Sequence, residues 1–275
     1  MSTAVVTDST ADFAGISPDE LAIQVVPLTV NWGQDVMRDR IDVTTEEFYE
    51  RLRYDKTLPK TAAPPVGIFE DLFRSLLAEH DEIISVHIAS KLSATHGVAA
   101  SAARSVDPQR IHVMDSRSVS VGVGWLAAQA AMLSIDGVPA ARVVDELEEM
   151  ADRLRLFLTL DTLEYLQRGG RIGRASAFVG GLLNVKPVLQ VLDGEIHPVE
   201  RVRTRNASVR RMAELTDLLG PKDLVAVVHG GCRGEAEALV TQISGEERVP
   251  IAEIGSVVGT HAGPGVLGIG CVLAR

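Results

Sequence analysis

The chain has 275 residues, of which 46% are apolar and 4% aromatic, and its 27 Lys and Arg against 37 Asp and Glu give a formal net charge of −10. This acidic balance excludes the basic surface that neutralises nucleic-acid phosphates, so we expect no nucleic-acid partner. The apolar content excludes a largely disordered chain, and the length suits two domains. With so few aromatic side chains, the core and any pocket should be mainly aliphatic.

The cysteines and the N-terminus favour a cytoplasmic protein. Cys232 and Cys271 show no metal-ligand spacing and fit small buried hydrophobic residues in a reducing compartment. The first residues lack the basic start and apolar run of a signal peptide. Residues 118–135 carry no charge but include three Ser, two Gly and a Gln, so they predict a buried helix instead of a membrane span. Any membrane contact should be transient.

Short β-branched apolar runs alternate with helical periodicity, which is typical of an α/β protein with a largely parallel sheet. The first expected strands are Thr3–Thr7, Ile23–Val30, Glu82–Ile88, Ile111–Asp115 and, at the boundary between the two halves, Leu156–Leu160. Thr44 and Glu47 form a capping-box pattern that predicts the start of a helix. Two further amphipathic helices are expected after Pro65 and over residues 143–154.

The second half has a different pattern. Its expected strands are Pro187–Leu192, Glu195–Val199, Leu224–His229, Ile251–Gly255 and Leu267–Leu273. Asp193-Gly194, between the first two, is a two-residue hairpin signal and indicates antiparallel pairing. We therefore expect an N-terminal, mostly parallel α/β domain over residues 1–155 and a C-terminal α+β domain with a mixed sheet over residues 156–275.

Three expected strands end in small hydroxyl residues. The segments are Thr7–Thr10, Ser90–Thr95 and Asp115-Ser116. Ligands bind beyond the carboxyl ends of parallel strands, where helix N-termini also favour an anion. The same residue types cap the helices that follow. The pattern leaves both roles open.

Arginines gather in two places in this acidic chain. Arg171 lies in the glycine-rich run QRGGRIGR, and Arg201, Arg203 and Arg205 share one face if their segment is extended. Alternate arginines can converge on one anion, whereas charged residues also protect a solvated strand edge. We expect an anion-binding role for Arg171 and for one arginine of the second group, and a structural role for the rest.

His261 lies between glycines and a proline in GTHAGPG, residues 259–265. Such a histidine is expected in an exposed turn, where it can donate or carry a proton. A variant nucleotide-binding pattern, Gly122-x-Gly124-x-x-Ala127, opens a helix, but six residues separate it from the strand ending at Asp115, where a tight turn is required.

The sequence lacks other signatures of cofactor or nucleophile chemistry. It contains no P-loop, no Gly-x-Ser-x-Gly elbow and no Ser-x-x-Lys pair. Its seven histidines show no ligand spacing, so we expect neither a metal nor a cofactor. The residue types favour an anion held by hydroxyls, arginine and histidine.

Several segments resemble the DegV family in order and spacing, over essentially the whole chain. They are TDSTAD (7–12), VVPLTV (25–30), KTAAPP (60–65), SKLSATH (90–96), MDSRSVSVGVG (114–124), the long run 161–196 and GTHAGPG (259–265). The run 161–196 is the most specific, and the arginines at 201 and 203 follow it.

The resemblance implies a two-domain DegV-like fold and a lipid-binding protein, not an enzyme. A long-chain fatty acid would lie in a tunnel between a sheet and helices, with its carboxylate near the domain junction. The head group would meet the hydroxyls of Thr61 and Ser93, and Arg171, Arg203 and His261 would form the adjacent polar network. The resemblance also implies a partner, an ATP-dependent fatty acid kinase that converts the presented carboxylate to an acyl-phosphate.

Two positions depart from the family pattern. Thr-Ser-x-Pro reads Thr61-Ala62-Ala63-Pro64, and Leu-Ser-Gly-Thr reads Leu92-Ser93-Ala94-Thr95, although both keep the hydroxyl expected at the head group. An alternative from a different class is an acyl hydrolase in which Ser93 is the nucleophile and His261 the base.

Overall fold

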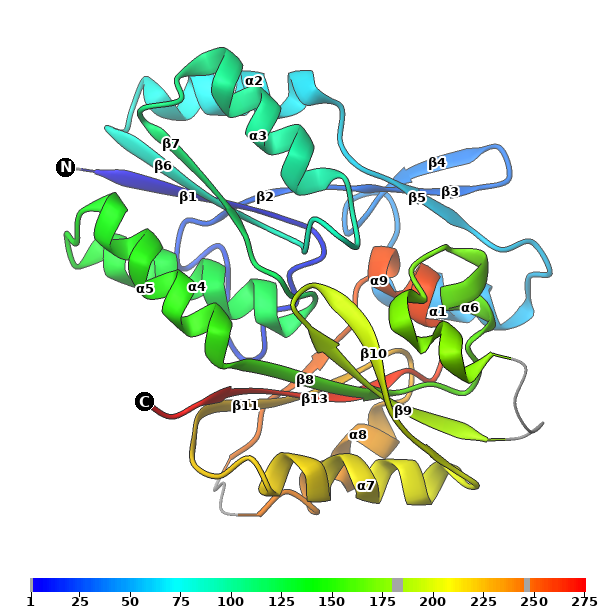
Figure 1. The fold of residues 1–275 in the computed structure, drawn as a ribbon. Helices are drawn as coiled ribbons and strands as arrows, with labels where there is room; N and C mark the ends of the chain where they lie inside the picture. Colours follow the sequence, from blue (N-terminus) through cyan, green and yellow to red (C-terminus); the bar gives the residue numbers. More distant parts are fainter. Residues whose placement is uncertain (1, 180–184, 245–247) are drawn as a thin grey trace.

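The first of the three β-sheets that the described residues form is parallel and belongs to the N-terminal half (Figure 1). The computed structural model describes residues 2–179, 185–244 and 248–275. In the order β2-β1-β6-β7, the sheet contains β1 (Thr3–Asp8), β2 (Gln24–Val26), β6 (Glu82–His87) and β7 (Ile111–Asp115). Every neighbouring pair is parallel. The parallel sheet expected in the N-terminal half is confirmed.

The second sheet is mixed and has the order β10-β9-β8-β13-β11-β12. Its strands are β8 (Leu154–Thr159), β9 (Lys186–Leu192), β10 (Glu195–Val202), β11 (Lys222–His229), β12 (Ile251–Glu253) and β13 (Leu267–Leu273). Only β11 and β12 pair in parallel. Asp193 and Gly194 have φ values of 48° and 73°, as a two-residue hairpin turn requires. The expected mixed sheet and its hairpin are confirmed.

The third sheet, with the order β4-β3-β5, was not expected. It is antiparallel and consists of β3 (Thr29–Trp32), β4 (Asp35–Arg38) and β5 (Lys60–Ala62). The expectation of one strand over Ile23–Val30 is wrong, because the run divides between β2 and β3, which belong to different sheets. Pro27 lies at the division, where it has no backbone N–H to donate to a ladder.

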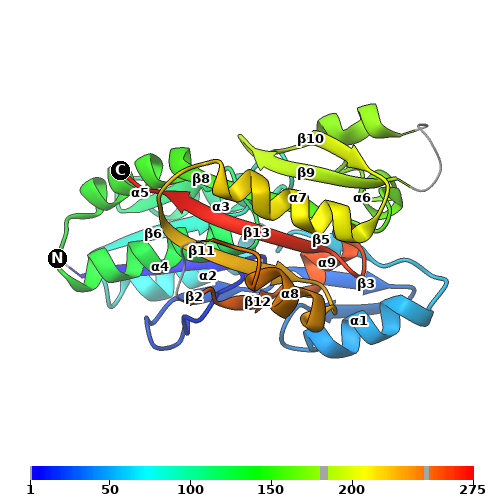
Figure 2. The same cartoon turned by 90° about the horizontal axis from the view of Figure 1, so that it is seen from below.

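Helices cover the two large sheets in layers (Figures 1 and 2). The outer face of the parallel sheet carries α2 (Val66–Leu77) and α3 (Thr95–Val106), and its inner face carries α4 (Val121–Ile135) and α5 (Ala140–Arg153). The outer face of the mixed sheet carries α7 (Arg205–Asp217) and α8 (Arg233–Val240). The two sheets therefore face each other across α4, α5 and a shared interior.

Shorter helices gather beside the third sheet. They are α1 (Thr45–Tyr54), α6 (Glu164–Arg168) and α9 (Ser256–Ala262), whereas a 3₁₀ helix (Gly173–Phe178) packs on β10 of the mixed sheet. The expected capping box is present at α1, since Thr44 Oγ1 accepts from the Glu47 amide and the Glu47 carboxylate accepts from the Thr44 amide. The short helix α9 contacts α1, α6, β3 and β5. It therefore joins the C-terminal half to the third sheet.

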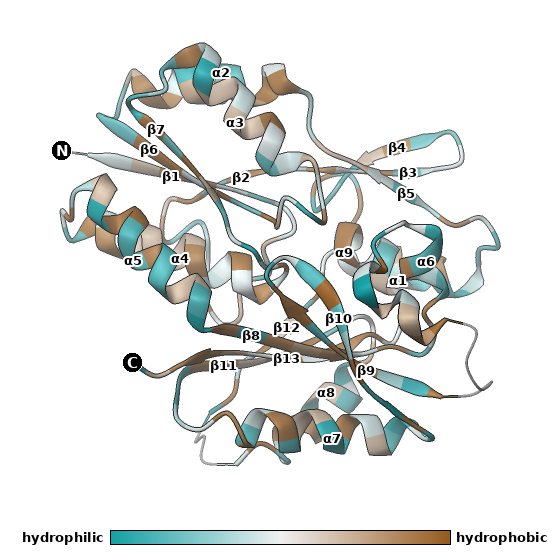
Figure 3. Cartoon of the chain, in the orientation of Figure 1, coloured by the Kyte–Doolittle hydropathy of each residue, from teal (hydrophilic) through white to brown (hydrophobic). Residues whose placement is uncertain are grey.

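The main core is aliphatic and lies between the two large sheets. One cluster of buried residues includes side chains from β1, α4, α5, β8 and β9. Figure 3 shows β8 as a largely hydrophobic strand, whereas hydrophilic residues recur along α5 and α7. The uncharged run 118–135 contains α4, whose residues from Val121 to Ala128 are buried, so the expected buried helix is confirmed. Among the described residues, no helix combines the length and apolar character needed to cross a membrane. Cys271 is buried and Cys232 half-buried, and both thiols are free.

Candidate functional site

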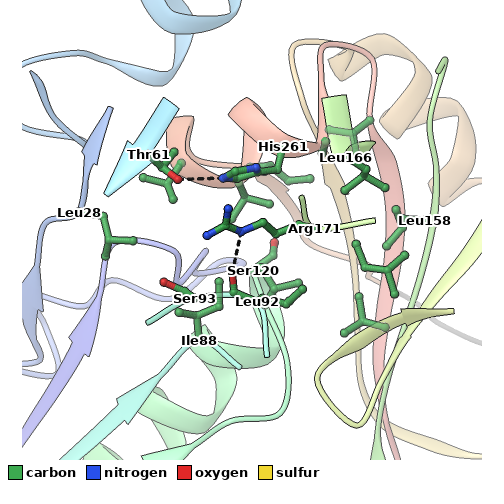
Figure 4. A pocket seen from close by; sticks show the side chains of 18 of the residues that line it. Leu28, Thr61, Ile88, Leu92, Ser93, Ser120, Leu158, Leu166, Arg171 and His261 are labelled. Atoms are coloured by element: carbon green, nitrogen blue, oxygen red, sulfur yellow. Dashed lines mark hydrogen bonds between the residues drawn. The ribbon is translucent and has the colours of Figure 1, made fainter. Parts of the chain in front are cut away.

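A cavity opens into the interior where the three sheets approach one another (Figure 4). Of its 23 lining residues, only Thr61, Ser93, Ser120, Arg171 and His261 are polar, and the remaining 18 are aliphatic. Both large sheets contribute walls, with Leu156 and Leu158 on one side and the Ile88–Ala94 loop on the other. The mainly aliphatic pocket expected from composition is confirmed.

The cavity is far larger than a packing defect. The space open to the centre of a water-sized sphere is about 130 Å³, whereas one buried water needs roughly 10–15 Å³ by the same measure. An interior of this size with aliphatic walls offers few hydrogen-bonding partners to water. It suits an apolar ligand with a polar group at one end.

Thr61 and His261 form the centre of the polar end. Thr61 projects from β5 and His261 from the last turn of α9, and Thr61 Oγ1 is hydrogen-bonded to His261 Nε2 at 2.8 Å. The expectation that His261 lies in an exposed turn is wrong, because it is helical and at least half-buried. Gly263, with φ of 80°, ends the helix immediately after it. The glycines around His261 thus terminate a helix that places the ring against the cavity.

The His261 ring is held against the backbone of a neighbouring turn. A Cβ atom at Gly169 would lie 2.2 Å from His261 Nδ1, so only glycine leaves room for the ring. Nδ1 is buried and has no hydrogen-bond partner in the described part of the chain. Burial, together with the nearby positive charge of Arg171, lowers the pKa of His261 to about 4. The imidazole is therefore neutral near pH 7.

Arg171 supplies a positive charge beside this pair. Its Nε donates to the Leu92 carbonyl at 3.0 Å and its Nη1 to the Gly169 carbonyl at 2.6 Å. Among the described residues, no carboxylate forms an ion pair with Arg171. The guanidinium is thus fixed by neutral carbonyls and retains its charge for an anion. Figure 4 shows it pointing toward the Thr61–His261 pair.

Ser93 lies on the opposite wall, in the loop between β6 and α3. Its Oγ is 2.9 Å from Thr95 Oγ1 and accepts from the Thr95 amide at 3.3 Å. The other strand-end groups serve the fold: the Asp8 carboxylate accepts from the Ile88 amide, and the Asp115 carboxylate accepts from the Ser90 amide. Of the three hydroxyl segments, only the one with Ser93 contributes a strand-end hydroxyl to the cavity.

Arg203 does not join the other sequence-predicted residues. It lines a separate surface hollow that also contains Asp161, Lys186 and Arg201. Thr61, Ser93, Arg171 and His261 are together in the cavity. Residues 180–184 of the specific run 161–196 lie outside the described residues.

Another hollow, different from the one that contains Arg203, adjoins the polar end of the cavity from outside. Thr61, Arg171 and His261 line both this hollow and the cavity, and the hollow adds Lys60 and Arg168. No carboxylate belongs to its described lining, although Arg168 pairs with Glu164 at 2.6 Å. This outer hollow, which we call the mouth of the cavity, is therefore cationic. Sequence reasoning missed Lys60, although its place next to Thr61 in KTAAPP could have suggested it.

The Gly122–Ala127 pattern has a packing role. A Cβ at Gly124 would lie 2.3 Å from the Asp12 carbonyl oxygen, and one at Gly122 would lie 2.1 Å from Ser118 Oγ. Both glycines are buried at the start of α4. Because protein atoms already occupy the surrounding space, this helix start has no room for a dinucleotide.

Comparisons with known proteins agree with this architecture. Residues 2–274 match the family model described as "Uncharacterised protein, DegV family". Protein DegV of Bacillus subtilis is 36% identical over 278 residues, covering 98% of each chain. A fatty-acid-binding DegV family protein from Thermus thermophilus has a solved structure with 32% identity, a TM-score of 0.92 and coverage of 100% of both chains. The structure of DegV, a fatty acid binding protein from Bacillus subtilis, has 34% identity, a TM-score of 0.87 and coverage of 99% of both chains.

Proposed function

The chain belongs to the DegV family, and on that premise we propose that it binds a long-chain fatty acid and presents the carboxylate to a partner ATP-dependent fatty acid kinase. The observation that carries the proposal is an aliphatic cavity whose polar end is formed by Thr61, Arg171 and His261. The solved relatives from Thermus thermophilus and Bacillus subtilis are themselves described as fatty-acid-binding proteins.

Affinity in this proposal comes from the hydrocarbon chain. Each methylene moved from water into the cavity contributes about 0.8 kcal/mol, offset in part by the entropy lost when a flexible chain is ordered. The polar end fixes the direction of the ligand. Arg171 provides a charge-assisted donor for the carboxylate, and the hydroxyls of Thr61 and Ser93 are donors on two different walls. Arg203 is left out of this head-group set because it lines another hollow.

Presentation to a kinase is supported by the cationic mouth. A carboxylate at Thr61 and Arg171 would lie at the boundary between the cavity and the outer hollow that contains Lys60 and Arg168. Positive groups at this boundary stabilise the charge of an incoming phosphoryl group. The partner would supply ATP, and one carboxylate oxygen would attack the γ-phosphorus and release ADP, leaving an acyl-phosphate at the mouth.

The hydrolase alternative lacks its required geometry. Ser93 Oγ is paired with Thr95 and His261 Nε2 with Thr61. A nucleophile needs a base within hydrogen-bond reach and a third group that orients the base. In the described structure, His261 Nδ1 has no carboxylate partner. Hydrolysis of long-chain esters that is abolished by Ser93→Ala would overturn this conclusion.

A cavity-filling variant tests the binding proposal. Val258 lines the cavity from α9, so Val258→Trp should occupy the space of the ligand chain and reduce stearic acid binding at least tenfold in calorimetric titration. Leu218→Trp, at an exposed site after α7, is the matched control and should bind as wild type does. Equal binding by all three proteins would place the ligand outside the cavity.

The kinase step needs a separate measurement. Arg171→Ala and His261→Ala should reduce acyl-phosphate formation in the presence of ATP and a fatty acid kinase more than they reduce stearic acid binding. The reason is that both side chains line the outer hollow as well as the cavity. Unchanged acyl-phosphate formation by both variants would remove them from the phosphoryl-transfer site.

A further inference from the structure

A buried carboxylate joins the two halves of the chain behind the cavity wall. Asp12, in the loop after β1, is 1% exposed. Its Oδ1 accepts from Arg40 Nη2 and, at 3.1 Å, from the Gly255 amide, and its Oδ2 accepts from Ser120 Oγ. Asp12 and Gly255 are 243 positions apart in sequence. One carboxylate thus connects the loop after β1, the segment after β4, the start of α4 and the start of α9.

Two of the connected segments, the start of α4 and the segment that leads into α9, supply cavity wall, and the segment after β4 is bonded to it. Ser120 lines the cavity itself, and Ile254 does so immediately before Gly255. Helix α9, for which Gly255 is the N-cap, carries Val257 and His261 into the lining. The amide of Asp39, the residue before Arg40, donates to the carbonyl of Leu28, which also lines the cavity. A change at Asp12 is therefore transmitted directly to several walls.

The backbone at Ser120 is strained and held by Asp12. Ser120 has φ of 58° and ψ of −129°, a conformation that L-residues rarely adopt because it is sterically strained. In addition to the side-chain bond, the Asp12 amide donates to the Ser120 carbonyl at 3.3 Å. The Arg40 guanidinium packs so closely on Gly255 that a Cβ there would lie 2.8 Å from Nη2. Strain of this kind persists only where neighbouring contacts enforce it.

We propose that Asp12 is a positioning residue whose ionised carboxylate latches the N-terminal half onto α9 and holds the cavity closed around its ligand. We call Asp12, Arg40, Ser120 and Gly255 the Asp12 latch. Loss of the negative charge releases Arg40 and weakens the hold on the start of α9. The ligand then dissociates faster. Only the choice of a fatty acid as ligand rests on the proposed function.

The environment of Asp12 makes the latch sensitive to mildly acidic pH. Burial raises the pKa of Asp12 from 3.8 to about 6, although Arg40 and the hydrogen bonds lower it, and Asp39 raises it further. Tyr49 of α1 stays neutral because burial and the surrounding carboxylates raise its pKa. From α4 and α9 only a hydroxyl and an amide face the carboxylate. The latch should therefore be ionised at pH 7.5 and largely neutral at pH 5.

Removing the charge of Asp12 has different effects on stability in the two cases. A simple structural support would lose stability, whereas a latch would not. Because the pKa of Asp12 is raised on folding, the folded chain binds the proton more tightly, and this group stabilises the fold as pH falls from about 6 toward 3.8. Asp12→Asn removes the charge at all pH values. At pH 7.5 it should leave the midpoint of thermal unfolding unchanged or higher, while it weakens ligand binding.

The test compares stearic acid binding by wild type, Asp12→Asn and the control Asp42→Asn between pH 5 and 7.5. Asp42 lies nearby, but its ion pair with Arg38 is exposed. At pH 7.5 Asp12→Asn should bind roughly tenfold more weakly than wild type, within the usual range of coupling between sites. The difference should disappear as pH falls through about 6, because wild type then loses the same charge. At each pH the ratio of the two dissociation constants is compared. The ligand's own titration affects both proteins equally and therefore cancels in this ratio.

Failure of the latch and failure of the proposed function give different results. If wild type binds stearic acid and Asp12→Asn binds equally well at pH 7.5, the latch is wrong. If wild type does not bind stearic acid, the proposed function fails, and amide hydrogen exchange of the ligand-free proteins decides the latch. Faster exchange across residues 255–262 in Asp12→Asn than in Asp42→Asn supports it, and equal exchange overturns it. Arg40→Gln should reproduce the Asp12→Asn exchange pattern if the latch is correct, and wild-type exchange in that variant contradicts it.

Discussion

Two pairs of a hydroxyl and an imidazole occur among the described residues, and their surroundings are opposite. In the first, Ser85 Oγ is 2.7 Å from His87 Nε2, and His87 Nδ1 is 2.9 Å from the Asp8 carboxylate. All three residues are fully buried. In the second, Thr61 Oγ1 is 2.8 Å from His261 Nε2, with Arg171 instead of a carboxylate nearby.

The difference shows that a hydroxyl–imidazole pair does not define a function by itself. The buried set has the order of a catalytic triad, but none of its members lines a described cavity, and every ring nitrogen is satisfied. It joins β1 to β6 and supports the fold. Within the described ranges no carboxylate is bonded to the imidazole of the cavity pair to make it a strong base, and the adjacent arginine favours an anion. The accessible pair is thus suited to binding and the inaccessible set to stability.

The largest effect is expected when the buried Ser85–His87–Asp8 set loses its carboxylate. Asp8→Asn should lower the free energy of unfolding by about 3–5 kcal/mol, because it leaves a buried partner uncompensated. Burial raises the pKa of Asp8, but hydrogen bonds and the charge of His87 outweigh this and lower it. Its contribution is therefore present above pH 3.8 and lost as pH falls further. Urea unfolding measures the change, with Asp42→Asn as control. A stable variant that no longer binds stearic acid would reverse the roles of the two regions.

The next effect concerns the charge at the cavity pair. Arg171→Gln should weaken stearic acid binding by about 1.5–3 kcal/mol, the usual contribution of a hydrogen bond to a charged group. Arg174→Gln is the matched control in the same loop, because Arg174 is exposed and pairs with Glu195. Calorimetric titration distinguishes the two variants. Equal losses in both would indicate a general charge effect and not a specific head-group contact.

A smaller effect tests how tightly the cavity pair is packed. Gly169→Ala places a methyl group against His261 Nδ1 and should destabilise the fold by about 1–3 kcal/mol, as overpacking does. Gly67→Ala in α2 meets no atom within 4 Å and should stabilise by up to about 1 kcal/mol. Thermal unfolding of both variants provides the comparison. A neutral Gly169→Ala would show that the His261 ring is free to move.

The smallest effect is a shift in protonation. Burial and Arg171 lower the pKa of His261 to about 4, so its ring should remain neutral at pH 6 in NMR titration. In Arg171→Gln the pKa should rise toward the ordinary range while burial still holds it down. Bound stearic acid should act in the same direction, because its negative charge offsets Arg171. A His261 ring that titrates near 6.5 in wild type would contradict the described environment.

Local patterns were sufficient to predict most of the two large sheets. The β7 and β13 bounds were predicted to the residue, and Asp193-Gly194 identified the β9–β10 hairpin, because β-branched runs and turn residues act over a few positions. The third sheet was missed because β4 and β5 are short and largely exposed, without an apolar run. Its pairing depends on contacts distant in sequence.

The site was likewise predicted only in part, because local motifs identify residues but not their contacts with distant parts of the chain. Thr61, Ser93, Arg171 and His261 were identified from motifs, and the structure brings all four to one cavity. The burial of His261 was not predicted, since the seven-residue α9 contains glycine and carries no amphipathic pattern. Nor was the Asp12–Ser120 contact, because residues 108 positions apart leave no local signal of their pairing.

The most direct test of the central claim, that the cavity holds a long-chain fatty acid, is native mass spectrometry of the chain purified from bacterial cells and then incubated with stearic acid. We expect one noncovalent fatty acid per chain in wild type and in Leu218→Trp, and none in Val258→Trp. Wild-type protein that carries no fatty acid even after incubation, or a Val258→Trp variant as fully loaded as wild type, would contradict the account.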